Sequence, residues 1–375
     1  MSLSYLTFLN NKTMFYDKID YTIIKKSWDI LSSHIKLPYV IHIVGTNGKG
    51  STGRYIASFL YQQDKTVLHY SSPHVMKFNE RIWLNNQDST NIELQYSHEQ
   101  LQKILPSEYL EKLTYFEYTT LMGIVLSHDM DYLVLEAGLG GEFDATNVVE
   151  NDLSVIPSIG LDHIEFLGNT IEKIATTKLR SCDNRYILGL NMPEKIKEVK
   201  QNILTTKEEI IINNNILLPK YSNDLPTYLQ NNLKLALSVL NYLNININNL
   251  ILPTLFARCQ RIQENITIDV GHNFLAASVI YEEFKNKKII LIYNSYKDKD
   301  YISVLTVLKP IIKELQIIDC DDDRMVKKYD LENTCNKLNI KYTNFSNKIS
   351  NKYNYLVFGS FKVIETFLNL RNDHK

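Results

Sequence analysis

The sequence has almost no net charge and few cysteines. It contains 41 basic and 42 acidic residues, which gives a formal net charge of −1. Binding nucleic acid through its phosphates requires a basic excess or stripe, so an electrostatic nucleic-acid binder is excluded. The cysteines show no CxxC or CxxH spacing, which predicts a reduced, cytoplasmic protein without structural zinc. They are Cys182, Cys259, Cys320 and Cys335.

Long apolar runs are also missing. No run reaches the roughly 18 residues of a membrane span, and the N-terminal segment lacks the basic start and apolar stretch of a secretory signal. We therefore expect neither a membrane partner nor secretion. Hydrophobic residues make up 44% of the chain and charged residues 22%, which is enough for a sizeable core. At roughly 150 residues per domain, the 375 residues predict two domains, or three.

Glycine is scarce, and its placement is informative. The chain has 13 glycines, about half the usual frequency, and seven of them fall in two short windows. In a glycine-poor chain, such windows predict places where the backbone turns tightly or approaches a ligand. The first window holds Gly45, Gly48, Gly50 and Gly53, and the second holds Gly138, Gly140 and Gly141.

Short β-type runs alternate with helical patterns in the first two thirds of the chain. Continuous apolar strands that alternate with helices are typical of a parallel sheet covered on both faces. The predicted strands cover residues 39–44, 66–70, 131–138, 153–160 and 185–190, and the predicted helices cover residues 51–62, 113–128 and 231–243.

The pattern restarts after Pro253. We place a domain boundary near residue 250, which predicts an α/β fold in two parts. A P-loop-type, mostly parallel sheet domain occupies residues 1–250, and a smaller Rossmann-like α/β domain occupies residues 251–375. The strands predicted after the boundary cover residues 266–270, 287–293, 315–319 and 355–360, with helices from about residue 275, at 301–308 and at the C-terminal end.

Residues 39–52, YVIHIVGTNGKGST, read as strand, glycine turn and helix start. Glycines let several backbone N–H groups point inward, a helix N-terminus adds positive potential, and Lys49 supplies a mobile charge. The hydroxyl of Ser51 or Thr52 suits Mg²⁺. The spacing differs from GxxxxGK[ST], since Gly50 separates the lysine from the serine. The segment predicts a phosphate-binding loop, with a glycine turn of no function as the alternative.

The loop sequence GTNGKGST resembles the ATP loop of the Mur ligase superfamily, and specifically of the folylpolyglutamate synthase/dihydrofolate synthase family. Further segments resemble the same family in the same order, over nearly the whole chain. They are residues 71–85, 114–120, 135–147, 160–178, 269–273, 297–300 and 359–360. The resemblance implies that ATP contacts Gly45, Thr46, Asn47, Gly48, Lys49, Gly50, Ser51, Thr52, Asn232, Arg258 and Asp269.

Glu136 ends one predicted strand, and Asp162 and His163 follow another. The carboxyl ends of strands in an open α/β sheet converge on the ligand crevice, so these groups are expected near the phosphate loop. Oxygen ligands with one imidazole suit Mg²⁺ or Mn²⁺ beside a triphosphate. The resemblance implies two metal sites with Ser51, Ser72, Glu136, His163 and Lys178 as ligands. The alternatives are a loop salt bridge for the glutamate and a capping or core histidine.

Lys178 near the end of the helical stretch TIEKIATTK has two interpretations. The sequence alone favours a solvated lysine at a helix C-terminus, where the helix dipole stabilises it. The resemblance implies a carbamylated lysine whose new carboxylate holds the second Mg²⁺. The chain departs from the family pattern after this lysine, with Leu179 and Arg180 in place of Ala-Gly.

The folate side is expected around residues 71–85, 114–117 and 142–147. Phe116 and Glu117 are predicted on an amphipathic helix, with core packing as the alternative for the phenylalanine. The resemblance implies substrate contacts by His74, Arg81, Phe116, Glu117 and Asp144. Glu142 stands where the family usually has an arginine.

The resemblance assigns further roles in the second domain. Arg258, with Arg261 as an alternative, is expected to contact the phosphates. Asp269 or His272 is expected to orient or deprotonate the incoming amine. Lys299 and Ser360 are expected on the glutamate side. The expected catalytic residues are Lys49, Lys178, Arg258, Asp269 and His272.

The expected reaction is ATP-dependent addition of L-glutamate to dihydropteroate or (tetrahydro)folate through an acyl phosphate, in a monomer without nucleic-acid or membrane partners. Two other functions stay open. A muramyl-type peptide ligase is disfavoured because only about 38 residues precede the first predicted strand, which leaves little room for a UDP-recognition domain. The other is a P-loop regulator that hydrolyses nucleotide without ligation.

Overall fold

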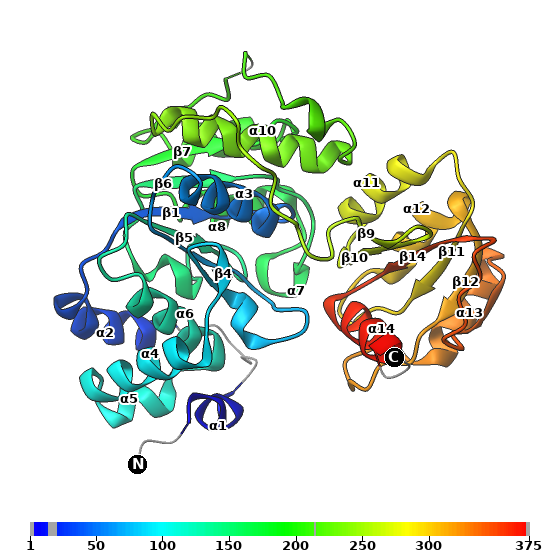
Figure 1. Ribbon diagram of the computed structural model, residues 1–375, viewed down its shortest axis with the longest axis horizontal. Coiled ribbons are helices and arrows are strands. Elements are labelled where there is room, and N and C mark those ends of the chain that lie inside the picture. Colours follow the sequence, from blue (N-terminus) through cyan, green and yellow to red (C-terminus); the bar gives the residue numbers. More distant parts are fainter. Residues whose placement is uncertain (1–3, 14–20, 214, 373–375) are drawn as a thin grey trace. The chain divides into compact units, whose positions relative to one another are not determined.

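The computed structural model describes residues 4–13, 21–213 and 215–372. The chain divides into two compact units. Unit 1 comprises Met1–Gly160, Ile164–Asn223 and Leu229–Pro253, and unit 2 comprises Leu161–His163, Asp224–Tyr228 and Thr254–Lys375. The short segment Leu161–His163 therefore packs with residues far away in the sequence. Each unit is an α/β layer structure with its own sheet (Figure 1).

The sheet of unit 1 has eight strands in the order β4-β3-β2-β5-β1-β6-β7-β8. The strands β2, β5, β1, β6, β7 and β8 pair in parallel, and β3 and β4 add an antiparallel edge next to β2. The strands are β1 Tyr39–Ile43, β2 Val67–Tyr70, β3 Ile82–Leu84, β4 Gln87–Asp88, β5 Tyr132–Glu136, β6 Leu153–Ile156, β7 Arg185–Leu188 and β8 Glu208–Ile210.

Helices cover both faces of this sheet. Gly53 of α3 lies against His69, whereas Gly123 of α6 lies against Tyr70. Successive residues of a strand point to opposite faces, so α3 and α6 lie on opposite sides of β2. The helices are α1 Tyr5–Asn10, α2 Thr22–Leu31, α3 Lys49–Tyr61, α4 Asn91–Ile104, α5 Ser107–Lys112, α6 Tyr115–Leu126, α7 Ile164–Leu167, α8 Ile171–Leu179, α9 Ile196–Ile203 and α10 Thr227–Tyr242.

The sheet of unit 2 has six strands in the order β13-β12-β11-β14-β10-β9, and only β9 is antiparallel to its neighbour. The strands are β9 Gln260–Gln263, β10 Ile266–Asp269, β11 Ile289–Tyr293, β12 Ile312–Ile317, β13 Tyr342–Asn344 and β14 Asn354–Phe358. The helices are α11 Phe274–Phe284, α12 Tyr301–Leu308, α13 Lys328–Leu338 and α14 Phe361–Asn372.

The predicted α/β class with two mostly parallel sheets is confirmed. Every strand expected from an apolar run is present, usually one to four residues shorter than its run. The prediction that the helix over residues 113–128 is amphipathic is wrong, since Glu117–Val125 of α6 are all buried. This helix is apolar on all sides because it is enclosed by the core that also contains Tyr70 and Leu121.

Hydrophobic clusters pack separately in the two units, with Leu133 in a cluster of unit 1 and Leu291 in the cluster of unit 2. None of the helices in the described part of the chain is long and apolar enough to cross a membrane. All four cysteines carry free thiols.

Candidate active site

The phosphate loop lies between the end of β1 at Ile43 and the start of α3 at Lys49. Gly48 caps the helix with a φ of +84°, a left-handed conformation that glycine adopts at low cost. A Cβ atom at this position would lie 2.8 Å from Oδ1 of Asn232. Asn232, which the resemblance places in the ATP site, therefore lies directly against the loop. No side chain caps the N-terminus of α3, so this helix end suits an anion.

Residues that follow β6 hold the phosphate loop in place through hydrogen bonds. The Ser158 hydroxyl accepts the backbone N–H of Asn47 at 3.0 Å and donates to its carbonyl at 2.9 Å. The Thr46 hydroxyl donates to the Gly160 carbonyl at 3.1 Å and accepts the Gly160 N–H at 3.0 Å. Ser158 was not singled out by the sequence reasoning. Its position at the end of the strand beside β1 is the signal that identifies it.

Two groups in the loop region are suited to phosphate or metal. Lys49 Nζ donates to the carbonyls of Gly45 and Thr46 at 3.1 and 3.3 Å, so its ammonium lies over the loop. The Thr52 hydroxyl is buried without a hydrogen-bond partner among the described residues. A buried unpaired hydroxyl is costly, and a phosphate oxygen or a metal ion bound in the loop would satisfy it.

Glu136 lies beside the start of the phosphate loop. It is the last residue of β5 and pairs in register with Ile43, the last residue of β1. Its side chain is 5% exposed, and its Oε2 accepts the backbone N–H of Ser72 at 3.4 Å. A carboxylate and a serine thus meet at the carboxyl ends of adjacent parallel strands, where oxygen ligands would suit Mg²⁺. In the described residues no group of three or more His, Cys, Asp or Glu could hold a metal by itself. Hydroxyls and phosphate oxygens would have to complete such a site.

Lys178 is not the solvated lysine that the sequence alone favoured. Its side chain is 3% exposed, and Nζ donates to the Gly45 carbonyl at 2.9 Å and to the Gly140 carbonyl at 3.3 Å. The Lys178 ammonium is therefore hydrogen-bonded to one carbonyl in each of the two glycine windows. Gly141 allows this packing, since a Cβ there would lie 3.0 Å from the Lys178 Cα.

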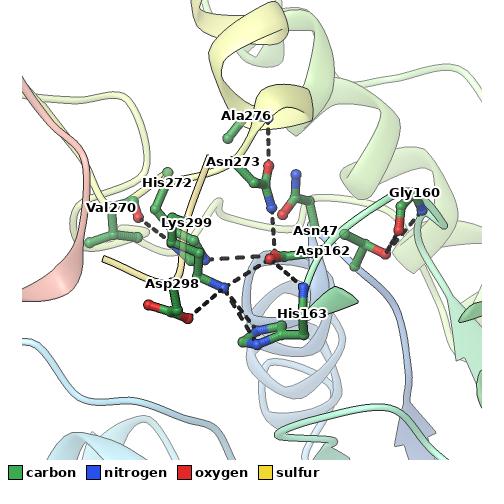
Figure 2. Close-up of polar contacts among 12 residues, drawn as sticks. Asn47, Gly160, Asp162, His163, Val270, His272, Asn273, Ala276, Asp298 and Lys299 are labelled. Atoms are coloured by element: carbon green, nitrogen blue, oxygen red, sulfur yellow. Dashed lines mark hydrogen bonds and ion pairs between the residues drawn. The ribbon is translucent and has the colours of Figure 1, made fainter. Parts of the chain in front are cut away.

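In unit 2, Asp162 and Lys299 form a buried ion pair at 2.8 Å, with side chains 10% and 7% exposed. Figure 2 shows that the Asn273 side chain and the backbone nitrogen of His163 also point toward the Asp162 carboxylate. Asn273 Nδ2 donates to Oδ2 at 2.8 Å, and the backbone N–H of His163 donates to Oδ1 at 2.9 Å. Burial raises the pKa of Asp162, but His163, His272 and Lys299 outweigh it and hold this pKa well below its usual range.

The ring of His163 lies against the Lys299 ammonium, with its nitrogens 3.3 and 3.4 Å from Nζ. The residue adopts a φ of +48°, which is uncommon outside glycine and turns the chain sharply before α7. His272 is oriented by its own loop, since Nδ1 lies 3.1 Å from the Val270 carbonyl and Nε2 lies 3.8 Å from Asp162.

Asp269 serves as an anchor for the loop that carries Arg258. Its carboxylate accepts hydrogen bonds from the N–H groups of Cys259 and Gly271 at 2.7 Å and from the Tyr228 hydroxyl at 2.9 Å. Burial raises its pKa above the ordinary value, against the lowering effect of Arg258 and of these donors. The Arg258 guanidinium lies over the Phe361 ring, 5.3 Å from the centroid. The alternative, Arg261, is exposed on β9. The observed role of Asp269 is therefore to hold the loop that carries Arg258 in place.

His74, Arg81 and Phe116 lie in an aromatic region of unit 1. Arg81 is buried over the ring of Tyr115, 5.2 Å from the centroid, and donates from Nε to His74 Nδ1 at 2.8 Å. Burial, reinforced by the Arg81 charge, lowers the pKa of His74 to about 4, so this histidine is neutral. The Phe116 ring lies against Gly138, where a Cβ would approach to 2.6 Å. The second glycine window is therefore shaped by an aromatic ring as well as by Lys178.

Three other expected substrate residues have local structural contacts. Asp144 accepts hydrogen bonds from the Leu139 N–H at 2.7 Å and from the Thr146 hydroxyl at 2.6 Å. Glu117 Oε2 accepts the Thr114 N–H and hydroxyl at 2.9 Å, which forms a capping box at the start of α6. Ser360 is buried, and its hydroxyl accepts the Val363 N–H at 3.1 Å at the start of α14. Their substrate contacts stay predictions.

A cavity of about 290 Å³ lies beside the second glycine window. Glu142 lines it and lies 3.4 Å from Arg180. The exposed rings of Phe143 and Phe166 give the cavity an aromatic wall. The combination of aromatic and charged groups suits an organic substrate with a flat ring.

Comparisons with known proteins identify the family to which the chain is related. The family profile of the Mur ligase middle domain matches residues 43–212. The dihydrofolate synthase/folylpolyglutamate synthase of Haemophilus influenzae is 32% identical in an alignment 332 positions long that covers 74% of this chain and 74% of that protein. The crystal structure of Helicobacter pylori folylpolyglutamate synthetase is 37% identical, covers 100% of this chain and 99% of that chain, and superposes with a TM-score of 0.78.

A third match is the bifunctional folylpolyglutamate synthase/dihydrofolate synthase of Yersinia pestis, whose structure is complexed with AMPPNP and an Mn ion. It is 23% identical, covers 99% of this chain and 97% of that chain, and has a TM-score of 0.81, so the likeness concerns the fold. Sequence and fold together give one conclusion. The chain belongs to the dihydrofolate synthase/folylpolyglutamate synthase family.

Proposed function

We propose that this protein is an ATP-dependent ligase that adds L-glutamate to dihydropteroate, to (tetrahydro)folate, or to both. The observation that carries the proposal is the convergence in unit 1 of the phosphate loop, Glu136 and the buried Lys178. The membership of the chain in a family of this activity supports it. A substrate carboxylate attacks the γ-phosphorus of ATP, which forms an acyl phosphate and releases ADP. The glutamate amine then attacks the acyl carbon, and phosphate leaves.

In this reaction the protein mainly positions the reactants and neutralises charge. Lys49 and the N–H groups at the start of α3 hold the triphosphate. Asn232 lies against Gly48, where it would border the nucleotide. Arg258 would stabilise the charge that develops on the transferred phosphoryl group. His272 would orient the incoming amine, and its ring is already fixed by Val270. Asp269 would act through Arg258, since its carboxylate holds the arginine's loop.

Divalent metal is expected at the phosphates. The donors present fit it, because Glu136 and Ser72 supply oxygens and the unpaired Thr52 hydroxyl lies in the loop. Ser51 and His163 are the other proposed ligands, and Lys178 joins them if it is carbamylated. Mg²⁺ or Mn²⁺ would neutralise phosphate charge and orient the γ-phosphoryl group.

We also propose that residues 1–250 form the ATP-binding domain and residues 251–375 the glutamate-ligase domain. His74, Arg81, Phe116, Glu117 and Asp144 are proposed for the folate side, and Lys299 and Ser360 for the glutamate side. The free thiols support a reducing, cytoplasmic setting. A monomer acting on small molecules is the proposed form.

The test is phosphate release from MgATP with dihydropteroate and with tetrahydrofolate, each with and without L-glutamate. We expect release that depends on both the pterin substrate and glutamate, and a product heavier by one glutamyl group in mass spectrometry. Phosphate release without either substrate would indicate a nucleotide-hydrolysing regulator instead. Activity only with a UDP-linked acid would indicate a muramyl-type ligase.

A further inference from the structure

The Asp162 carboxylate joins three separate segments of unit 2. It accepts hydrogen bonds from Lys299 Nζ, from Asn273 Nδ2 and from the His163 backbone, all within 2.9 Å. These donors come from the segment after β11, from the start of α11 and from its own turn (Figure 2). A carboxylate that is 10% exposed and bound by three donors fixes the geometry of all three segments.

Two of these segments carry groups expected to meet the amino acid, since Lys299 lies on one and His272 precedes Asn273 on another. Lys299 presents an ammonium, and Asn273 caps α11 by accepting the Ala276 N–H at 2.9 Å. A lysine ammonium favours a carboxylate partner, and glutamate carries two carboxylates. The lysine side chain is long and flexible, so its placement depends on a partner that holds it.

We propose that Asp162 is a positioning residue for the amino-acid substrate, holding Lys299 where its ammonium receives a glutamate carboxylate and fixing the start of α11 beside it. The inference rests on the proposed function. It goes beyond the proposed function by assigning a specific task to Asp162, which that function leaves without one. Asp162 also follows Gly160, which is bonded to Thr46 of the phosphate loop, by only two residues.

The test compares Asp162→Asn with the matched variant Asp298→Asn. Asp298 lies 3.8 Å from the same Lys299 Nζ, but its side chain is 50% exposed. In Asp162→Asn, an amide replaces one acceptor, and Lys299 loses its buried counter-charge. We expect the KM for glutamate to rise at least tenfold while the KM for ATP changes less than threefold. Asp298→Asn should leave both constants within twofold of wild type.

Hydrogen exchange of the protein without substrates gives a second readout. Asp162→Asn should speed exchange at the amides of residues 274–277 and 298–301, but not at residues 46–50 of the phosphate loop. A merely global loss of stability would speed exchange in all these segments together. Equal behaviour of the two variants in KM and in exchange would overturn the proposal, as would parallel rises of both KM values.

Asn273→Asp covers the case in which Asp162→Asn does not fold. It keeps an oxygen to cap α11 but replaces the amide donor by a second carboxylate facing Asp162. A raised KM for glutamate is expected, and an unchanged one would count against the proposal. If wild type shows no glutamate-dependent phosphate release, the proposed function fails instead. The exchange experiment still decides whether Asp162 organises these segments.

Discussion

Lys178 shows how burial changes the meaning of a residue. The sequence predicts a helix that ends near Lys178, and a lysine at a helix C-terminus is usually surrounded by solvent. In the structure its ammonium is bonded to carbonyls of both glycine windows, beneath the phosphate loop. A buried lysine beside a metal-binding region is a candidate for carbamylation, because the modification needs the neutral amine and yields an anion that binds metal.

We predict that Lys178→Ala loses nearly all ligase activity and regains part of it with acetate, which would replace the carboxylate of a carbamate. Lys197→Ala is the control, since Lys197 is 73% exposed on α9. Activity assays with and without acetate, together with melting curves, check this. Full activity of Lys178→Ala would exclude the carbamate, and inactivity with a strongly lowered melting temperature would assign the lysine a structural role.

Lys12 is a further buried lysine, outside the candidate site. Its ammonium bonds to the carbonyls of Leu110 and Glu111 at the end of α5 and lies 4.7 Å from the centroid of the Phe8 ring. Burial lowers its pKa to about 8 from the ordinary 10.5, although Glu111 and Glu117 act in the opposite direction.

A lowered lysine pKa has a definite consequence for stability. Between pH 8 and 10.5 the unfolded chain binds a proton that the folded chain has released, so this residue makes stability rise with pH across that window. Lys12→Met removes the contribution. We expect the unfolding free energy of wild type, measured by urea titration, to rise relative to that of Lys12→Met as the pH increases from 8 to 10.5. A constant difference between the two proteins would contradict the shifted pKa.

Gly53 corrects the view that both glycine windows serve turns or ligands. It lies inside α3, where a Cβ atom would be 2.5 Å from Nε2 of the buried His69 on β2. The helix can approach the sheet closely because this position has no side chain. Gly45 and Gly48, by contrast, belong to the loop itself.

We predict that Gly53→Ala lowers the unfolding free energy by about 1–2 kcal/mol. Overpacking usually costs about 1–3 kcal/mol, whereas alanine is the better helix former by about 1 kcal/mol. In a His69→Ala background the ring is gone, so the same change should become neutral or stabilising. Denaturant unfolding of the four proteins measures this. Equal effects in both backgrounds would show that the histidine is not the obstacle.

Capping boxes begin two helices of unit 1, and one of them contains an expected substrate residue. Thr114 and Glu117 cap α6, and Thr90 and Glu93 cap α4 in the same way. We predict that Glu117→Ala and Glu93→Ala each lose about 1 kcal/mol of stability. Only Glu117→Ala should raise the KM for the pterin substrate. If neither variant changes this KM, Glu117 acts as a cap alone.

The whole protein offers a test of the phosphate loop that does not depend on turnover. A non-hydrolysable ATP analogue with Mg²⁺ at about 100 times its Kd stabilises the folded chain by about 2.7 kcal/mol. We expect a clear rise in the melting temperature of wild type. Lys49→Ala should lose most of this rise and at least about a hundredfold in activity, while its melting temperature without ligand stays close to that of wild type. A full ligand-induced rise in Lys49→Ala would remove the lysine from the nucleotide site.

Local patterns determined the longer apolar strands, the phosphate loop and the α/β class of this protein. Each depends on neighbouring residues: an apolar run forms a buried strand, and a glycine turn between strand and helix exposes backbone N–H groups. The family resemblance added the ligase function, which the comparisons support. The strands β3, β4, β8, β9 and β13 were not predicted, because none is longer than four residues. Several helices were not predicted either, among them α4, α13 and the helices before β1.

Tertiary structure decided which polar groups face one another. The carboxylates of Asp162, Asp269 and Glu117 look alike in the sequence, but one holds a lysine, one anchors an arginine loop and one caps a helix. The burial of Lys178 and the support of the loop by Ser158 depend on strand order and helix packing. The contacts of Asp162 with Lys299, of Lys178 with Gly45 and of Ser158 with Asn47 join residues more than a hundred positions apart. Only the completed fold brings such residues within hydrogen-bonding distance.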